Sequence, residues 1–183
     1  MPAFICLLRG VNVGGNKMLK MDALKRLCGS LGLKDASTYL QSGNVVFRSD
    51  VTDRAVIVRR LEEGIRKACA LDVRVILRTT AELKKVIEAN PLDPSERNPK
   101  GLLVAFQNGE LGKGAKELLS SLKAPTEELA FGSREIYLYF TEGIADSKLS
   151  NALTEKKLGV TVTARNWNTV NALLQMGEEL ERE

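Results

Sequence analysis

The sequence contains no histidine among its 183 residues. This absence excludes Ser-His-Asp triads and Cys-His pairs, and it removes the imidazole ligand on which most zinc sites depend. Cysteine is scarce as well, since only Cys6, Cys28 and Cys69 occur, widely spaced and in apolar surroundings. That spacing predicts reduced core thiols and no disulfide framework. No metal site and no cofactor are therefore predicted, and any catalysis would use carboxylates, lysines, tyrosines or backbone dipoles.

Long apolar runs are also missing from the chain. No run approaches the roughly 20 residues that a membrane helix needs. The opening segment MPAFICLL has no basic start and no small-residue cleavage site, so it does not have the pattern of a signal peptide. We therefore expect a cytoplasmic protein with no membrane partner.

The charge of the chain is divided unevenly between its halves. Residues 1–90 carry 16 Lys and Arg against 9 Asp and Glu, whereas residues 91–183 carry 11 against 14. The first half is therefore basic, with a balance of +7, and the second half has a balance of −3 and an acidic C-terminus. A basic half attracts anionic ligands, although solvated surface charge is the simpler interpretation.

Apolar periodicity in the first half alternates between strand and helix. It predicts strands at 3–8, 37–41, 44–48 and 73–77, and helices at 21–31, 53–69 and 80–90. Gly32 ends the first predicted helix, and Asp53 can cap the second. The resulting order is βαββαβ with one added helix.

A proline-rich segment, 91–100, interrupts this pattern, and the pattern then repeats. The second half predicts a strand, a helix, a hairpin, a helix over 146–159 capped by Asp146, a strand and a closing helix. Aligning the last strand of each half places Arg78 over Arg165. We therefore predict an α+β fold of two tandem ferredoxin-like βαββαβ units with antiparallel sheets, each with an added C-terminal helix. The expected boundaries are 1–90 for the first half, 91–100 for the linker and 101–183 for the second half.

This topology brings two loops together at one end of the first sheet. The loop after the first strand and the hairpin loop lie at the same edge, beside the start of the first helix, where backbone N–H groups can face an anion. The candidate ligand-binding residues are Arg9, Gly10, Asn12, Gly14, Gly15, Asn16, Lys17, Lys20, Ser42, Gly43 and Asn44. Arg9 is the expected specific contact, because its base is fixed by the strand while its guanidinium can reach over the loop.

Known phosphate-binding motifs do not explain these glycines. Gly10 and Gly15 have the spacing of a P-loop, but Asn16 stands where that motif needs lysine and Met18 where it needs a hydroxyl. A GxGxxG fingerprint is absent as well. The alternative is that Gly14 and Gly15 only carry the chain from strand to helix with positive φ, and that residues 42–44 are simply a hairpin turn.

A second candidate cluster lies near the end of the chain, at Arg165, Asn166, Trp167 and Asn168. One asparagine can cap the closing helix while Trp167 packs in the core, and base stacking on Trp167 is the alternative. RNA recognition on the sheet surface is not favoured, because the first strand is apolar on both faces and lacks exposed aromatic residues.

Four segments together resemble those of a known family: LLRGVNVGG, SGNVVF, the NP of the linker and TARNWNTVNAL. With them the chain resembles the bacterial domain of unknown function 1697 family over its whole length. The resemblance implies an α+β fold and assigns no activity and no catalytic residue.

Three hypotheses for function follow from the residues. The first is a binding protein for a phosphate-bearing ligand, nucleic acid or nucleotide, at the glycine-rich loops. The second is a histidine-independent enzyme on a small anionic metabolite, using groups such as Asp22, Lys17, Lys20 and Tyr39. The third is a protein–protein interaction module, and the chain would be either a monomer or a homodimer through its strand edges.

Overall fold

The structure is a computed structural model that describes residues 1–15 and 17–182. The chain divides into two compact units: unit 1 comprises Met1–Lys84 with Ala172–Glu183, and unit 2 comprises Lys85–Asn171. Each unit contains one four-stranded antiparallel sheet with its helices. The predicted α+β fold of two tandem ferredoxin-like units is thus confirmed.

The sheet of unit 1 has the strand order of a ferredoxin-like unit, with the first strand in the interior. Its strands lie in the order β2-β3-β1-β4, and they are β1 (Ala3–Leu8), β2 (Lys34–Tyr39), β3 (Asn44–Arg48) and β4 (Val75–Thr79). All six residues of β1 are buried, so both faces of the sheet are covered there. The edge strand β2 is irregular between Lys34 and Ser37, and such irregular, charged edges discourage pairing with another strand.

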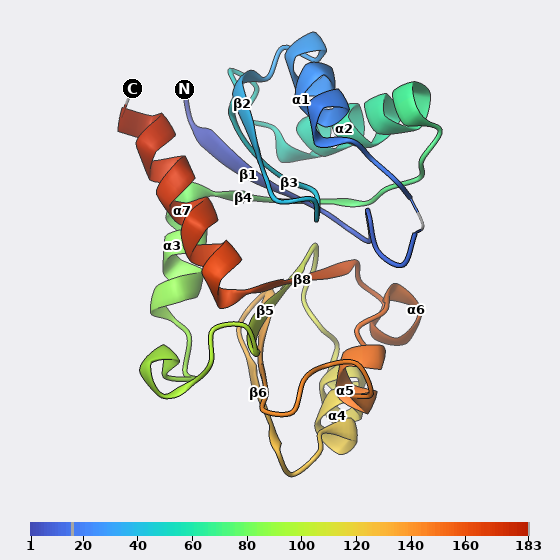
Figure 1. Cartoon of the computed structure of the whole chain (residues 1–183), viewed down its shortest axis with the longest axis vertical. Helices are drawn as coiled ribbons and strands as arrows, with labels where there is room; N and C mark the ends of the chain where they lie inside the picture. The colour runs from blue at the N-terminus through green and yellow to red at the C-terminus, as the bar shows by residue number, and fades with distance from the viewer. Residues whose placement is uncertain (16, 183) are drawn as a thin grey trace. The chain divides into compact units, whose positions relative to one another are not determined.

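One face of this sheet packs against α1 (Met21–Ser30) and α2 (Arg54–Cys69), which lie side by side in Figure 1. The carboxylate of Asp53 accepts hydrogen bonds from the N–H groups of Ala55 and Val56, which confirms the predicted cap. The core between helices and sheet contains Phe4, Cys6, Leu8, Leu24, Cys28, Phe47, Ile57, Leu61 and Ile65. Their burial fixes the start of α1 beside the end of β1.

The opposite face of the sheet carries Ile5 and receives the end of α7 (Trp167–Arg182). Gly177 lies against Ile5 and against Thr80, where α3 (Thr80–Glu88) begins. Glu181 accepts a hydrogen bond from the Ala3 N–H at 3.4 Å, and Arg48 donates one to the Leu180 carbonyl. Residues 172–182 therefore complete unit 1, although they follow unit 2 in the chain (Figure 1).

Unit 2 repeats the same sheet in the order β6-β7-β5-β8. Its strands are β5 (Leu102–Gln107), β6 (Glu127–Phe131), β7 (Glu135–Phe140) and β8 (Val162–Asn166), and its helices include α4 (Lys113–Leu122), α5 (Lys148–Asn151) and α6 (Glu155–Leu158). The helix predicted over 146–159 is wrong, because this segment forms the two short helices α5 and α6. Ser147, not Asp146, caps α5, and Thr154 caps α6. Hydroxyl side chains that bond to nearby N–H groups begin a new helix at each of these positions.

The proline-rich segment is held against unit 2. Pro94 begins η1 (Pro94–Glu96), a short 3-10 helix, and Pro91 and Pro99 lie before and after it. Arg97 then donates two hydrogen bonds to the carboxylate of Glu128 on β6, at 2.8 and 2.7 Å, and its guanidinium lies over the ring of Tyr139. A bidentate pair of this kind fixes orientation as well as distance. The boundary at 91–100 stays a proposal.

Arg78 and Arg165 occupy equivalent positions of the two sheets. Arg78 on β4 pairs with Ile5 of β1, and Arg165 on β8 pairs with Val104 of β5. Both arginines are buried, and each donates from Nη1 to the carbonyl of the residue before it. The alignment from sequence therefore identified a real structural correspondence between the halves.

The three thiols differ in exposure, and we expect them to differ in reactivity. Cys6 and Cys28 are buried, whereas Cys69 at the end of α2 is half-buried. Burial raises the pKa of the Cys28 thiol from 9.0 to about 11, which lowers its thiolate fraction at pH 8 about a hundredfold. Iodoacetamide at pH 8 should therefore alkylate Cys69 first, as read by peptide mass spectrometry of the native protein. Equal labelling of Cys28 and Cys69 would contradict this.

Candidate functional site

The loop after β1 reverses the sign of its backbone φ repeatedly. Among its described residues, φ is positive at Gly10 (+64°), Asn12 (+55°), Gly14 (+58°), Gly15 (+77°) and Lys17 (+48°). Val11 and Val13, which stand between them, are outside this left-handed region. Positive φ at several positions of one short loop can turn neighbouring N–H groups toward a common side, and concavities of this kind bind anions.

Asn12 holds the ends of this loop together. Its side-chain oxygen accepts a hydrogen bond from the Leu19 N–H at 2.8 Å, and its side-chain nitrogen donates to the Leu19 carbonyl at 2.9 Å. Its backbone N–H donates to the carbonyl of Lys17. Asparagine also tolerates positive φ better than most residues. It therefore fits this position both by its hydrogen bonds and by its backbone conformation.

The hairpin loop between β2 and β3 lies directly against this first loop. Asn12 donates a further hydrogen bond to the carbonyl of Gln41 at 2.6 Å, and the Leu8 N–H donates to the carbonyl of Gly43 at 2.8 Å. A Cβ atom on Gly43 would lie only 2.5 Å from Val11 Cγ2 and 2.8 Å from Leu8 Cβ. The predicted convergence of the two loops is confirmed.

Asn44 and Ser42 stabilise the hairpin itself. The Asn44 amide is fully buried and donates to the Tyr39 carbonyl at 2.8 Å and to the Ser42 hydroxyl at 2.9 Å. These two hydrogen bonds give the Asn44 amide a structural role in the turn. Asn16, the remaining asparagine of the candidate set, lies outside the described residues.

Positive charge surrounds the loop after β1 and the β2–β3 hairpin loop, which we call the paired loops. Lys20 is exposed and occupies the N-cap position of α1, where no side chain caps the helix. Lys17 is also exposed, and its ammonium donates to the Asp72 carbonyl at 2.5 Å. Arg9 is half-buried at the end of β1, where its N–H donates to the Arg74 carbonyl. The N-terminus of the ten-residue helix α1 carries a partial positive charge, which adds to the charge of these side chains.

Exposed apolar side chains also lie on the paired loops, and they are not among the residues predicted from the sequence. Val13 is 63% exposed, Met18 is 69% exposed and Leu40 is 56% exposed. No sequence pattern separates these residues from Val11, which belongs to the loop after β1 and is buried. These loops therefore offer both cationic and apolar contacts.

The second candidate cluster, residues 165–168, lies in unit 2, and three of its residues make hydrogen bonds there. Asn166 accepts a hydrogen bond from the Thr169 N–H and so caps α7, as predicted for one of the two asparagines. Arg165 is buried and donates to Thr163 and to Ala164. Trp167 is half-buried, its N–H donates to the Pro99 carbonyl, and Asn168 is exposed.

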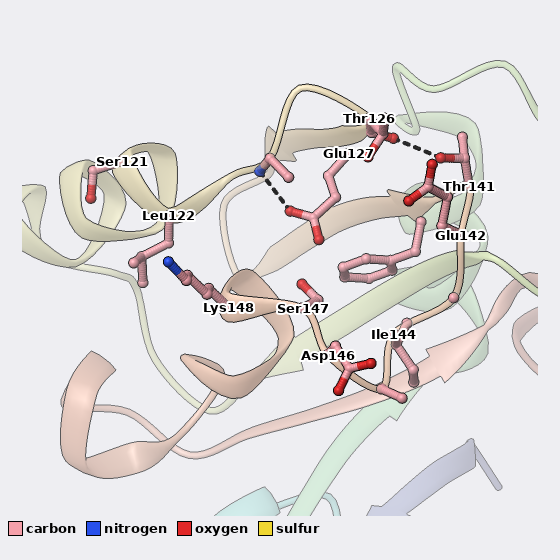
Figure 2. Close-up of a pocket in the computed structure, with 14 residues that line it drawn as sticks. Ser121, Leu122, Thr126, Glu127, Thr141, Glu142, Ile144, Asp146, Ser147 and Lys148 are labelled. Carbon is pink, nitrogen blue, oxygen red and sulfur yellow. Dashed lines mark hydrogen bonds between the residues drawn. The ribbon is translucent and has the colours of Figure 1, made fainter.

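A cavity of about 610 Å³ in unit 2 was not anticipated from the sequence. It lies between the end of α4, the start of β6 and the loop from β7 to α5, and Figure 2 shows the side chains that line it. Because these segments are far apart in the chain, no local motif marks the cavity.

Within the described residues, no group of three or more cysteine, aspartate and glutamate side chains is placed to hold a metal ion. The helices of the same residues are all too short or too polar to cross a bilayer.

These features define a two-unit α+β protein with a cationic, glycine-rich loop pair on its first sheet. The chain belongs to the family described as a protein of unknown function (DUF1697), which matches residues 1–137. Its fold is similar to that of the conserved bacterial protein SP0830 from Streptococcus pneumoniae. The TM-score is 0.77 at 24% identity, over 96% of this chain and 98% of that one. No curated protein shows significant similarity to the present chain.

Proposed function

We propose that this protein binds a phosphate-bearing ligand, a nucleic acid or a nucleotide, at the paired loops of unit 1. The observation that supports the proposal is the set of positive φ values at Gly10, Asn12, Gly14, Gly15 and Lys17 beside the start of α1. Backbone N–H groups in such a concavity and at a helix N-terminus favour phosphate over neutral groups. The free thiols of the chain favour a reducing compartment, so we place this activity in the cytoplasm.

The charge of unit 1 supports an anionic ligand. Beyond Lys17 and Lys20, the outward side of α2 carries four exposed cations: Arg59, Arg60, Arg66 and Lys67. Such a surface raises the local concentration of anions and accelerates their association at low salt. Asp22, in the first turn of α1, opposes this effect and is the main acidic side chain near the start of the helix.

The exposed apolar residues favour a ligand with a base over inorganic phosphate. Val13, Met18 and Leu40 present flexible or branched apolar surface beside the cationic groups. A nucleobase is flat and mostly apolar on its faces, so it can cover such surface while the phosphate lies at the backbone N–H groups. Inorganic phosphate would leave these side chains in water.

Lys20→Gln is the variant that tests this proposal, because Lys20 is exposed and its loss should not affect folding. The matched control is Lys84→Gln, an exposed lysine of α3. The paired loops lie at the end of the sheet where β1 finishes, at Leu8. The β4 strand begins opposite Leu8 and ends opposite Phe4, so α3 and Lys84 follow the opposite end of the sheet. We expect Lys20→Gln to weaken binding about tenfold, the scale of one charged hydrogen bond, and Lys84→Gln to leave it unchanged.

Two assays separate the forms of ligand. Labelled single- and double-stranded oligonucleotides should bind more weakly at 200 mM than at 50 mM salt if phosphates carry the affinity. Mononucleotides should raise the melting temperature if the site takes a single nucleotide. The proposal is rejected if neither oligonucleotides at low salt nor mononucleotides bind, or if Lys20→Gln and Lys84→Gln weaken binding equally.

A further inference from the structure

The cavity of unit 2 has a volume suited to a small organic ligand. At about 610 Å³ it falls within the range of about 300–1,000 Å³ typical of small-molecule sites. Its wall is partly apolar, with Leu122 from the end of α4, Phe140 from the end of β7 and Ile144 from the following loop. Ile144 is 45% exposed, an unusual exposure for a large apolar side chain, and a ligand with an apolar body would cover it.

Glu127 gives the cavity a buried negative charge. The residue is 8% exposed at the start of β6, and one carboxylate oxygen, Oε2, accepts a hydrogen bond from the Ala124 N–H at 2.8 Å. In the described part of the chain, no hydrogen bond is made to its other oxygen, Oε1. Figure 2 shows the Glu127 side chain extending from β6 into the space that the other lining residues surround.

The surrounding charges favour a cation. Two further carboxylates, those of Glu142 and Asp146, line the cavity against the single ammonium of Lys148, so the lining carries a balance of −2. Lys123 lies nearby, but its ammonium is bound to the backbone carbonyls of Ala124 and Glu127. The C-terminus of the ten-residue helix α4 has no basic residue in its last turn, and its partial negative charge adds to that of the carboxylates.

We infer that this cavity binds a small organic cation, an amine or guanidinium compound with an apolar body, with Glu127 as its counter-ion. The cation would occupy the unbonded side of the Glu127 carboxylate, and its body would lie on Leu122, Phe140 and Ile144. Burial strengthens such a pair because water screens it less. This site is independent of the paired loops, because all of its residues belong to unit 2.

A series of three ligands with one phenyl body tests the charge preference. Phenethylamine, 2-phenylethanol and 3-phenylpropanoate are cationic, neutral and anionic, and each can be titrated into the full-length protein by ¹H–¹⁵N correlation spectroscopy. We expect phenethylamine to shift the amides of residues 121–124, 126–127 and 141–148, and to bind at least tenfold more tightly than 3-phenylpropanoate. Equal affinity of the three ligands, or shifts elsewhere only, would overturn the inference.

Two variants should move the affinity for phenethylamine in opposite directions. Glu127→Gln keeps an oxygen for the Ala124 N–H but removes the charge, so affinity should fall at least tenfold. Lys148→Gln removes the competing cation from an exposed position of α5, so affinity should rise several-fold. An unchanged or reduced affinity in Lys148→Gln would count against the inference even if Glu127→Gln did not fold. Neither result depends on whether the paired loops bind phosphate.

Discussion

Replacing Gly43 by alanine should destabilise unit 1 by about 2–5 kcal/mol. The backbone φ of Gly43 is +77°, and a left-handed conformation costs a residue with a Cβ about 1–2 kcal/mol. The new Cβ would also lie 2.5 Å from Val11 Cγ2 and 2.8 Å from Leu8 Cβ, and overpacking of this kind typically costs about 1–3 kcal/mol. Leu8 cannot retreat easily, because its strand is buried on both faces.

Gly14→Ala is the matched control for this prediction. Its φ is similar, at +58°, but nothing lies within 4 Å of the position that its Cβ would take. Only the conformational cost of about 1–2 kcal/mol remains there. Native-state hydrogen exchange of the β1 and β3 amides reports the opening free energy of unit 1 itself. Equal losses in the two variants would show that the hairpin does not press on the first loop.

Asn12→Ala should open the paired loops and abolish ligand binding with a loss of about 3–5 kcal/mol in stability. The variant removes three side-chain hydrogen bonds, two to Leu19 and one to Gln41, each with a net contribution of about 0.5–1.5 kcal/mol. It also places a less tolerant residue at a φ of +55°. Binding should be lost because the proposed anion site depends on the loop conformation that these hydrogen bonds hold.

Asn12→Gly separates the two causes. Glycine accepts the positive φ without strain but makes none of the three side-chain hydrogen bonds. We expect Asn12→Gly to be more stable than Asn12→Ala by about 1–2 kcal/mol, and to bind ligand as poorly. Hydrogen exchange of the Leu19 amide and the nucleotide titration check the two parts. If Asn12→Gly bound as tightly as the unchanged protein, the side chain of Asn12 would not be what shapes the site.

The sequence was sufficient to predict the order of the strands and the meeting of the loops. Apolar periodicity and the Asp53 cap are local signals, and the ferredoxin-like topology then places the end of β1 beside the β2–β3 hairpin. The hydrogen bond between Asn12 and Gln41 joins the two loops at this end of the sheet. The contact between these two residues could not be predicted, because Asn12 and Gln41 are 29 positions apart and no local pattern connects them.

Other features depended on contacts that no local pattern records. The segment over 146–159 was predicted as one helix, yet the hydroxyls of Ser147 and Thr154 each begin a separate short helix. The loop that precedes α5 supplies Ile144 and Asp146 to the cavity of unit 2. Glu127 reads as an ordinary strand residue in the sequence, and only the packing of β6 beside α4 shows its burial.

The route of the chain has a consequence for how the protein is made in the cell. Residues 172–182 cover the Ile5 face of the unit 1 sheet, yet they are translated after the whole of unit 2. At 5–20 residues per second, the 87 residues between Lys84 and Ala172 delay them by about 4–17 s. A nascent chain therefore carries unit 1 with one apolar sheet face uncovered while unit 2 is already complete. Substitutions in the last turns of α7 should therefore first prolong the time for which the nascent chain needs chaperones. Their effect on the stability of the finished protein comes later.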